Sequence, residues 1–221
     1  MKLSTLIQSI INNAPFIRES MDAGLINYTS LARYLQPKVQ RHFDKKINTS
    51  AIVMAIARMP PSPSQSLDKS LRSFMQQLGN VVVRSDIEDF SYAHSSSIQA
   101  SQSRFLASID NASQHYYSIC MGMNETTIVV SKHLQSQVEA IFIDETLVVH
   151  RSNLAALGIK LPKSNQEVSG VYYTLLKQLA WQGINIVEVL STSNEITLVV
   201  SKSDIDQVFA MVMRLKNEVM N

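Results

Sequence analysis

The stretch Asn124–Phe142, NETTIVVSKHLQSQVEAIF, recurs seventy residues later as Asn194–Val212, NEITLVVSKSDIDQVFAMV. Ten of the nineteen aligned residues are identical. A repeat of this kind predicts that one supersecondary unit has been duplicated, with each copy burying surface that the other leaves open. We therefore expect the function to lie in a paired module in the C-terminal two-thirds of the chain.

The sequence around the repeat alternates between helical and β-branched segments, which predicts an α+β fold. In each copy a helix precedes a hairpin and a second helix follows it. The expected strands are 80–91, 115–123, 125–131, 145–150, 154–161, 184–191 and 195–201. Each copy is thus a βαββα unit with a possible fourth strand, so the C-terminal part is predicted to form tandem ferredoxin-like (βαββαβ) units.

Residues 1–59 predict a small domain made only of helices. Apolar residues recur at helical spacing from Leu31 to Phe43, and Ala51–Arg58 is an apolar segment that must be largely buried. Prolines at 60, 61 and 63 then break the helical pattern. The predicted organisation is a helical domain at 1–59, a Pro/Ser linker at 60–66, a first unit with its leading helix at 67–150, and a second unit at 151–221.

Composition indicates an ordinary globular protein with an uneven charge distribution. Residues 1–59 hold eight Lys or Arg against three Asp or Glu, a net charge of +5, whereas residues 60–221 hold twelve against fifteen, a net charge of −3. Cys120 is the single cysteine, so no intrachain disulfide can form. No run of about 18 apolar residues occurs, and the first residues predict an amphipathic helix instead of a signal peptide. We expect a cytoplasmic protein without a membrane partner.

The basic helical domain raises the possibility of DNA binding through a helix-turn-helix-like arrangement. The candidate phosphate contacts are Lys38, Arg41, Lys45, Lys46 and Arg58. Against this interpretation, a recognition helix must present polar side chains to base edges, and residues 51–57 have none. A helical domain for dimerisation or partner docking requires the same apolar helices, so both alternatives remain open.

The second copy resembles the regulatory ACT domain at the C-terminus of aspartate kinases. The resemblance is carried by Ser169-Gly170-Val171, by Gly183-Ile184-Asn185-Ile186, and by a Ser-rich turn entering Glu195-Ile196. The first copy keeps the hairpin and second helix but lacks the Gly-Ile-Asn-Ile segment. The resemblance implies a homodimeric regulatory protein that binds a free amino acid or similar effector at an interface between paired units.

The resemblance also implies a set of ligand contacts in the second copy. They are Gly170, Val171, Asn185, Ile186, Ser191 and Ser193. Independently of the resemblance, Gly170 lets a ligand approach the backbone closely, amides at a helix start favour a carboxylate, and Asn185 offers both a donor and an acceptor. The alternative is that these residues are only caps, turns and loop positions.

The sequence shows no chemistry of its own, so we expect no catalytic residues, metal or cofactor. About eighty residues precede the first copy, and they contain no Gly-rich phosphate loop, so we expect no kinase activity. The densest carboxylates are Asp86, Glu88 and Asp89, and the first two share one face of the expected strand. A pair of this kind can bind a cation or act as acid and base, but we interpret it as a solvated strand face. Three hypotheses result: an effector-binding regulator, an effector-responsive DNA-binding regulator, and a structural adaptor.

Overall fold

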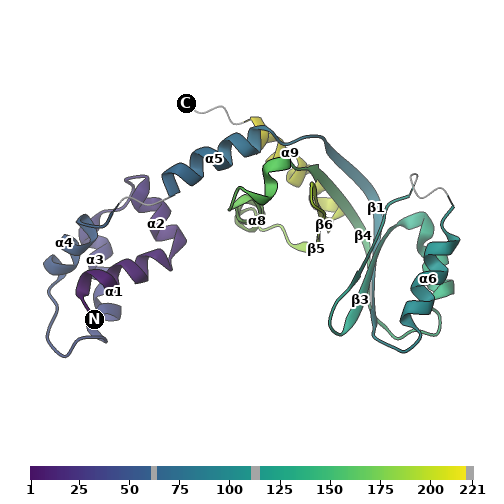
Figure 1. Ribbon diagram of the computed structural model, residues 1–221, viewed down its shortest axis with the longest axis horizontal. Coiled ribbons are helices and arrows are strands. Elements are labelled where there is room, and N and C mark those ends of the chain that lie inside the picture. Colours follow the sequence, from purple (N-terminus) through teal and green to yellow (C-terminus); the bar gives the residue numbers. More distant parts are fainter. Residues whose placement is uncertain (61–63, 111–114, 218–221) are drawn as a thin grey trace. The chain divides into compact units, whose positions relative to one another are not determined.

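The computed structural model describes residues 1–60, 64–110 and 115–217, with backbone alone at 64–68. The chain divides into two compact units, Met1–Ser70 and Leu71–Asn221, and most of their helices and strands are labelled in Figure 1. Part of the predicted linker, residues 61–63, lies outside the described residues. Helix α5, Ser64–Gln76, begins inside the remainder of that predicted linker.

The first unit is helical, as predicted. Its helices are α1 (Leu3–Asn12), α2 (Pro15–Asp22), α3 (Tyr28–Gln40) and α4 (Thr49–Ala57). Asn27 caps α3 because its side-chain Oδ1 accepts hydrogen bonds from the amides of Thr29 and Ser30, both at 3.0 Å. Pro37 lies inside this helix, yet α3 continues to Gln40 as one element.

The core of the helical unit confirms the apolar periodicity of its sequence. Ile7 and Ile11 of α1, Leu35 of α3 and Ile52 of α4 are completely buried together. Each of these side chains contributes about 1.5–3 kcal/mol by leaving water. The long apolar segment at 51–58 is thereby explained by burial of one face of α4.

The second unit contains one antiparallel sheet of six strands with helices beside it. Its elements after α5 are β1 (Val81–Ala93), α6 (Ile98–Ser108), β2 (Tyr117–Met121), β3 (Glu125–Ser131), η2 (Lys132–Leu134), α7 (Gln135–Ile141), β4 (Leu147–Lys160), η3 (Lys163–Gln166), α8 (Val171–Trp181), β5 (Ile186–Ser191), β6 (Glu195–Ser201), η4 (Lys202–Asp204) and α9 (Ile205–Asn217). The strand order is β2-β3-β1-β4-β6-β5. The two predicted hairpins are β2-β3 and β5-β6.

Two long strands, β1 and β4, run through the centre of the sheet and belong to both repeats (Figure 1). The C-terminal part of β1 pairs with β3, and the C-terminal part of β4 pairs with β6. The N-terminal part of each long strand supplies the fourth strand of the other repeat. Both repeats therefore have the ferredoxin-like strand order, which confirms the predicted α+β fold class.

The observed strand boundaries differ from those expected from sequence, because the two long strands are shared between the repeats. The expected strands at 145–150 and 154–161 are one strand, β4, and the predicted division between residues 150 and 151 falls inside it. The sequence between them looked like a break because Ser152 and Asn153 are polar. Asp86 in β1 and Asn153 in β4 have φ of 57° and 56°, where the β1–β4 register shifts. Each long strand thus carries a bulge that lets it pass from one repeat to the other.

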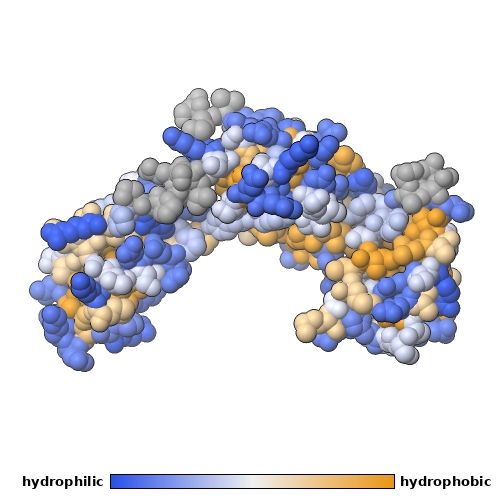
Figure 2. Space-filling model, viewed as in Figure 1, coloured by the Kyte–Doolittle hydropathy of each residue, from blue (hydrophilic) through white to orange (hydrophobic). Residues whose placement is uncertain are grey.

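Helices cover one face of each repeat and form two separate cores. Phe90, Phe105 and Phe142 are buried in the first, and Leu157 and Leu175 in the second. The face without helices holds a smaller cluster that joins the two repeats: Ile87, Val129, Leu154, Ala156 and Val199. Figure 2 shows hydrophobic and hydrophilic patches next to each other on this unit. Among the described residues, no helix combines the length and apolar character needed to cross a bilayer.

Candidate functional site

The expected ligand loop lies at the start of α8. Gly170 has φ of +89°, which favours glycine, and no side chain caps the helix there. Gly170 is exposed, whereas the Val171 side chain is 2% exposed and packs in the core of the second repeat. The uncapped helix start offers backbone amides to a carboxylate, and Val171 can contribute only its amide.

Asn185 and Ile186 lie at the opposite end of the same helix. Gly183, with φ of +70°, terminates the α8 region before the chain enters β5. Helix α8 has 11 residues, so its ends are about 16 Å apart. One copy of the chain therefore does not bring Asn185 to the Gly170 loop.

The two serines occupy the Gly170 end of the repeat. The hydroxyls of Tyr172 and Ser191 lie 2.7 Å apart, which fixes the end of β5 beside the first turn of α8. Ser193 is exposed in the turn that joins β5 to β6. The predicted site residues thus form two groups, with Gly170, Ser191 and Ser193 at one end of α8 and Asn185 and Ile186 at the other.

Strand β5 is an edge of the sheet, because its only neighbour in the strand order is β6. One row of its backbone amides and carbonyls therefore faces away from the sheet. Val189 in the middle of this strand is 42% exposed. An edge of this kind can accept another strand by main-chain hydrogen bonding.

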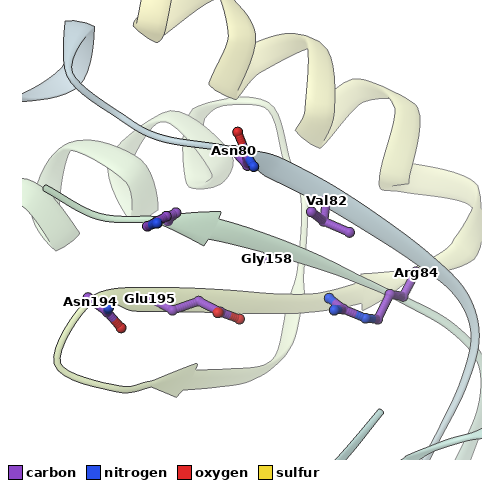
Figure 3. Close-up of a pocket in the computed structure, with 7 residues that line it drawn as sticks. Asn80, Val82, Arg84, Gly158, Asn194 and Glu195 are labelled. Atoms are coloured by element: carbon purple, nitrogen blue, oxygen red, sulfur yellow. The ribbon is translucent and has the colours of Figure 1, made fainter. Parts of the chain in front are cut away.

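A second candidate site, which the sequence did not predict, lies on the helix-free face of the second repeat (Figure 3). It is an open pocket of about 280 Å³ lined by Asn80, Val82, Arg84, Gly158, Lys160, Asn194 and Glu195. These residues come from β1, β4 and the start of β6, which are distant in sequence. The available signal was an unexplained glycine, Gly158, within a predicted strand.

Glu88 does not lie on a solvated strand face, so that interpretation is wrong for this residue. Glu88 and its neighbour Asp89 are both buried, at 1% and 0% exposure. Asp89 Oδ2 accepts a hydrogen bond from Arg151 Nη1 at 2.8 Å, and Asp89 Oδ1 has no partner. Burial raises the pKa of Asp89, and the Arg151 guanidinium opposes this effect. Glu88 Oε2 lies 2.9 Å from His150 Nε2.

Asp86 does remain exposed and forms an ion pair with Lys202 at 2.7 Å. Hydrogen bonding and charge attraction from Lys202 lower the pKa of Asp86. Because both partners are about half exposed, this pair contributes little to stability. It connects the bulge of β1 to the turn that follows β6.

The five basic residues proposed for DNA contact are all exposed. Lys38 is in α3, Arg41, Lys45 and Lys46 follow it in the segment before α4, and Arg58 is the C-cap of α4. The exposed side of α4 includes Ala51 and Met54. Apolar side chains of this kind do not read base edges by hydrogen bonding.

These features define an ACT-type fold, in which two ferredoxin-like repeats form one sheet. No protein-family profile matches the chain, and no curated protein matches it.

Solved structures share this architecture at low sequence identity. The regulatory subunit of aspartate kinase from Thermus thermophilus has a TM-score of 0.50 and 12% identity, with 62% of this chain and 97% of that chain covered. An aspartokinase alpha and beta subunit structure has a TM-score of 0.51 and 10% identity, with coverage of 64% and 99%. The aspartate kinase of Clostridium acetobutylicum has a TM-score of 0.52 and 9% identity, and 62% of this chain matches 34% of that larger chain. The fold is therefore that of aspartate kinase regulatory domains.

Proposed function

We propose that this chain is a non-catalytic regulatory protein that binds a free amino acid or a similar small effector. The fold shared with aspartate kinase regulatory subunits supports this role. The observation that carries the proposal is the uncapped, glycine-initiated start of α8 beside Ser191. An amino acid's carboxylate fits such a helix start, because the first amides of a helix have no partner within the helix and the helix dipole favours negative charge.

A second copy of the chain would complete this site. If two β5 strands pair antiparallel about a twofold axis between Glu188 and Val189, Ile186 of one copy lies opposite Ser191 of the other. Asn185 of the second copy then approaches the Gly170 end of the first. The exposed edge of β5 and the separation of the two residue groups along α8 both support this homodimer.

In the dimer, the two groups of residues have different roles. Amides at Gly170 and Val171 receive the carboxylate, and the Ser191 hydroxyl offers a further hydrogen bond. The side-chain oxygen of Asn185 from the second copy accepts a hydrogen bond from the ammonium group. Binding thereby stabilises the pairing of copies, which is how occupancy would be transmitted.

The experiment is a thermal unfolding screen of the full chain against the standard amino acids. A ligand at about 100 times its Kd stabilises the folded state by ~2.7 kcal/mol. Gly170→Ala and Asn185→Ala should each abolish the stabilisation. Gly24→Ala is the matched control, since Gly24 has φ of +70° in the helical unit and an alanine there would introduce similar backbone strain. If no amino acid stabilises the wild type, the proposal is wrong.

DNA binding by the helical unit is the second candidate function, because its exposed basic residues cluster after α3. Phosphate contacts release counterions, so affinity for random duplex DNA must fall as salt rises. Replacing both Lys45 and Lys46 by Gln should weaken binding and reduce that salt dependence. Unchanged duplex mobility at low salt with the full chain would eliminate this candidate.

A further inference from the structure

The strand register allows each position of one repeat to be matched with its equivalent in the other. Ser91 lies between Val149 and Thr127, and Gly158 lies in the same way between Val82 and Thr197. Ser91 and Gly158 are therefore equivalent positions. Because both repeats have the same fold, a difference between equivalent residues indicates a property that only one repeat has.

In the first repeat a serine side chain occupies this position, and an ion pair neutralises the nearby Arg151. Ser91 is 4% exposed, and its hydroxyl lies 3.1 Å from the Thr127 hydroxyl. Two residues earlier on the same face, Asp89 lies opposite Arg151 and forms an ion pair with it. This part of the first repeat's helix-free face therefore holds a hydroxyl pair and an ion pair.

In the second repeat the two equivalent positions are occupied by smaller residues without polar side chains. Ala156 lies opposite Arg84, in the place where Asp89 lies opposite Arg151. Gly158 replaces the serine, and a Cβ added there would meet Glu195 Oε1 at 3.4 Å and Arg84 Nη1 at 3.5 Å. Within the described part of the chain, Arg84 forms no ion pair, so its charge is available to a ligand.

Tyr116 from the first repeat holds Arg84 beside the pocket. The guanidinium carbon of Arg84 lies 5.2 Å from the centre of the Tyr116 ring. Burial raises the pKa of the Tyr116 hydroxyl, and the neighbouring Thr197 of the same face opposes this effect. This cation–π contact positions Arg84, and none of the hydrogen bonds among the described residues uses its guanidinium group.

The pocket contains charges of both signs. Glu195 Oε1 accepts a hydrogen bond from the Thr197 hydroxyl at 3.2 Å and faces the space above Gly158, as Figure 3 shows. Lys160 is the residue directly opposite Glu195 in the β4–β6 pairing. Two cations and one anion therefore surround a space that the missing Cβ of Gly158 creates.

We propose that this pocket is a second ligand site that binds a small amino dicarboxylate. The two carboxylates of such a ligand match Arg84 and Lys160, and its ammonium group matches Glu195. The ligand's net charge of −1 complements the pocket's net charge of +1. A volume of about 280 Å³ lies near the small end of ligand sites, which span about 300–1,000 Å³. The site shares no residue with the Gly170 loop, so it goes beyond the proposed function.

The test is calorimetric titration of the full chain with L-aspartate and L-glutamate. Gly158→Ser restores the residue type that the first repeat tolerates, and it should weaken binding at least tenfold by filling the pocket. Arg84→Gln should weaken it to a similar extent. Arg33→Gln, an exposed arginine of the helical unit, is the matched control and should leave affinity unchanged. Circular dichroism confirms that each variant is folded.

Two further arms separate the possible results. Glutarate lacks the ammonium group and should bind at least tenfold more weakly than glutamate; equal binding would overturn the role of Glu195. Gly170→Ala should leave this site intact. If Gly170→Ala abolishes binding of the acidic amino acids while Gly158→Ser does not, this inference is wrong and the proposed function stands. If neither acid binds, this inference is also wrong. The thermal unfolding screen with the other amino acids then still tests the proposed function.

Discussion

Removal of Arg151 should destabilise the protein in a strongly pH-dependent way. Arg151→Met keeps much of the side chain's length but removes the one hydrogen bond that the side chain of the completely buried Asp89 accepts among the described residues. An unpaired buried carboxylate is so unfavourable that the group takes up a proton instead. The cost of the substitution is therefore limited by the free energy of protonating Asp89.

That limit can be calculated from the pH. The ordinary pKa of an aspartic acid is about 4, so protonation at pH 7 spans about three pH units, or ~4 kcal/mol, whereas at pH 5 it costs only ~1.4 kcal/mol. Burial raises the folded-state pKa of Asp89. The stabilisation that comes with a neutral Asp89 is therefore fully present below pH ~4, and it is lost as pH rises through the folded-state pKa. We expect a loss of ~2–4 kcal/mol at pH 7 and at most ~1.5 kcal/mol at pH 5.

The assay is urea unfolding at the two pH values, followed by the fluorescence of Trp181 in the α/β unit. The control is Asp89→Ala combined with Arg151→Met, which removes the orphaned charge and should recover much of the stability. The second repeat shows that alanine fits there, since Ala156 occupies the equivalent position. A loss of stability that is the same at pH 5 and pH 7, or a double variant less stable than Arg151→Met, would refute this reasoning.

Three other substitutions test local features of the fold. Asn27→Ala should cost ~1 kcal/mol by removing the α3 cap, visible as about fivefold faster amide hydrogen exchange in that helix; unchanged exchange would count against the cap. Leu157→Ala, at a fully buried site, should cost ~2–5 kcal/mol in urea unfolding, and a cost below 1 kcal/mol would contradict tight packing. Burial raises the pKa of Tyr92 to about 12, so stability is complete below pH ~10 and should fall by ~2–3 kcal/mol as pH rises toward 12. Tyr92→Phe should remove that part of the alkaline loss, and an identical alkaline profile would refute the assignment.

The elements of the fold could largely be predicted from sequence because they depend on local patterns. Both hairpins follow from β-branched runs around a turn, and the helix that begins at Val171 follows from apolar spacing and flanking glycines. The joining of two expected strands into β4 could not be predicted from sequence, because Ser152 and Asn153 interrupt the apolar pattern. Their role is to form a bulge, which depends on pairing with a strand about seventy residues away.

The candidate sites also depend on contacts that local sequence patterns do not reveal. Gly170 and Asn185 are close in sequence and resemble one motif, yet the length of α8 separates them, so their meeting requires a second copy. The pocket above Gly158 involves Arg84, which pairs with Ala156 across two long strands. Burial of Glu88 and Asp89 also depends on tertiary packing, and their polar character in the sequence indicated the opposite.

The central claim is that an amino acid effector binds where two copies of the chain meet. The most direct measurement is a crystal structure of the full chain grown with whichever amino acid stabilises it most. The account predicts two β5 strands paired antiparallel, with ligand density between Gly170 and Ser191 of one copy and Asn185 of the other. Copies that do not join through β5, or an empty space at this junction in the presence of that amino acid, would contradict the claim.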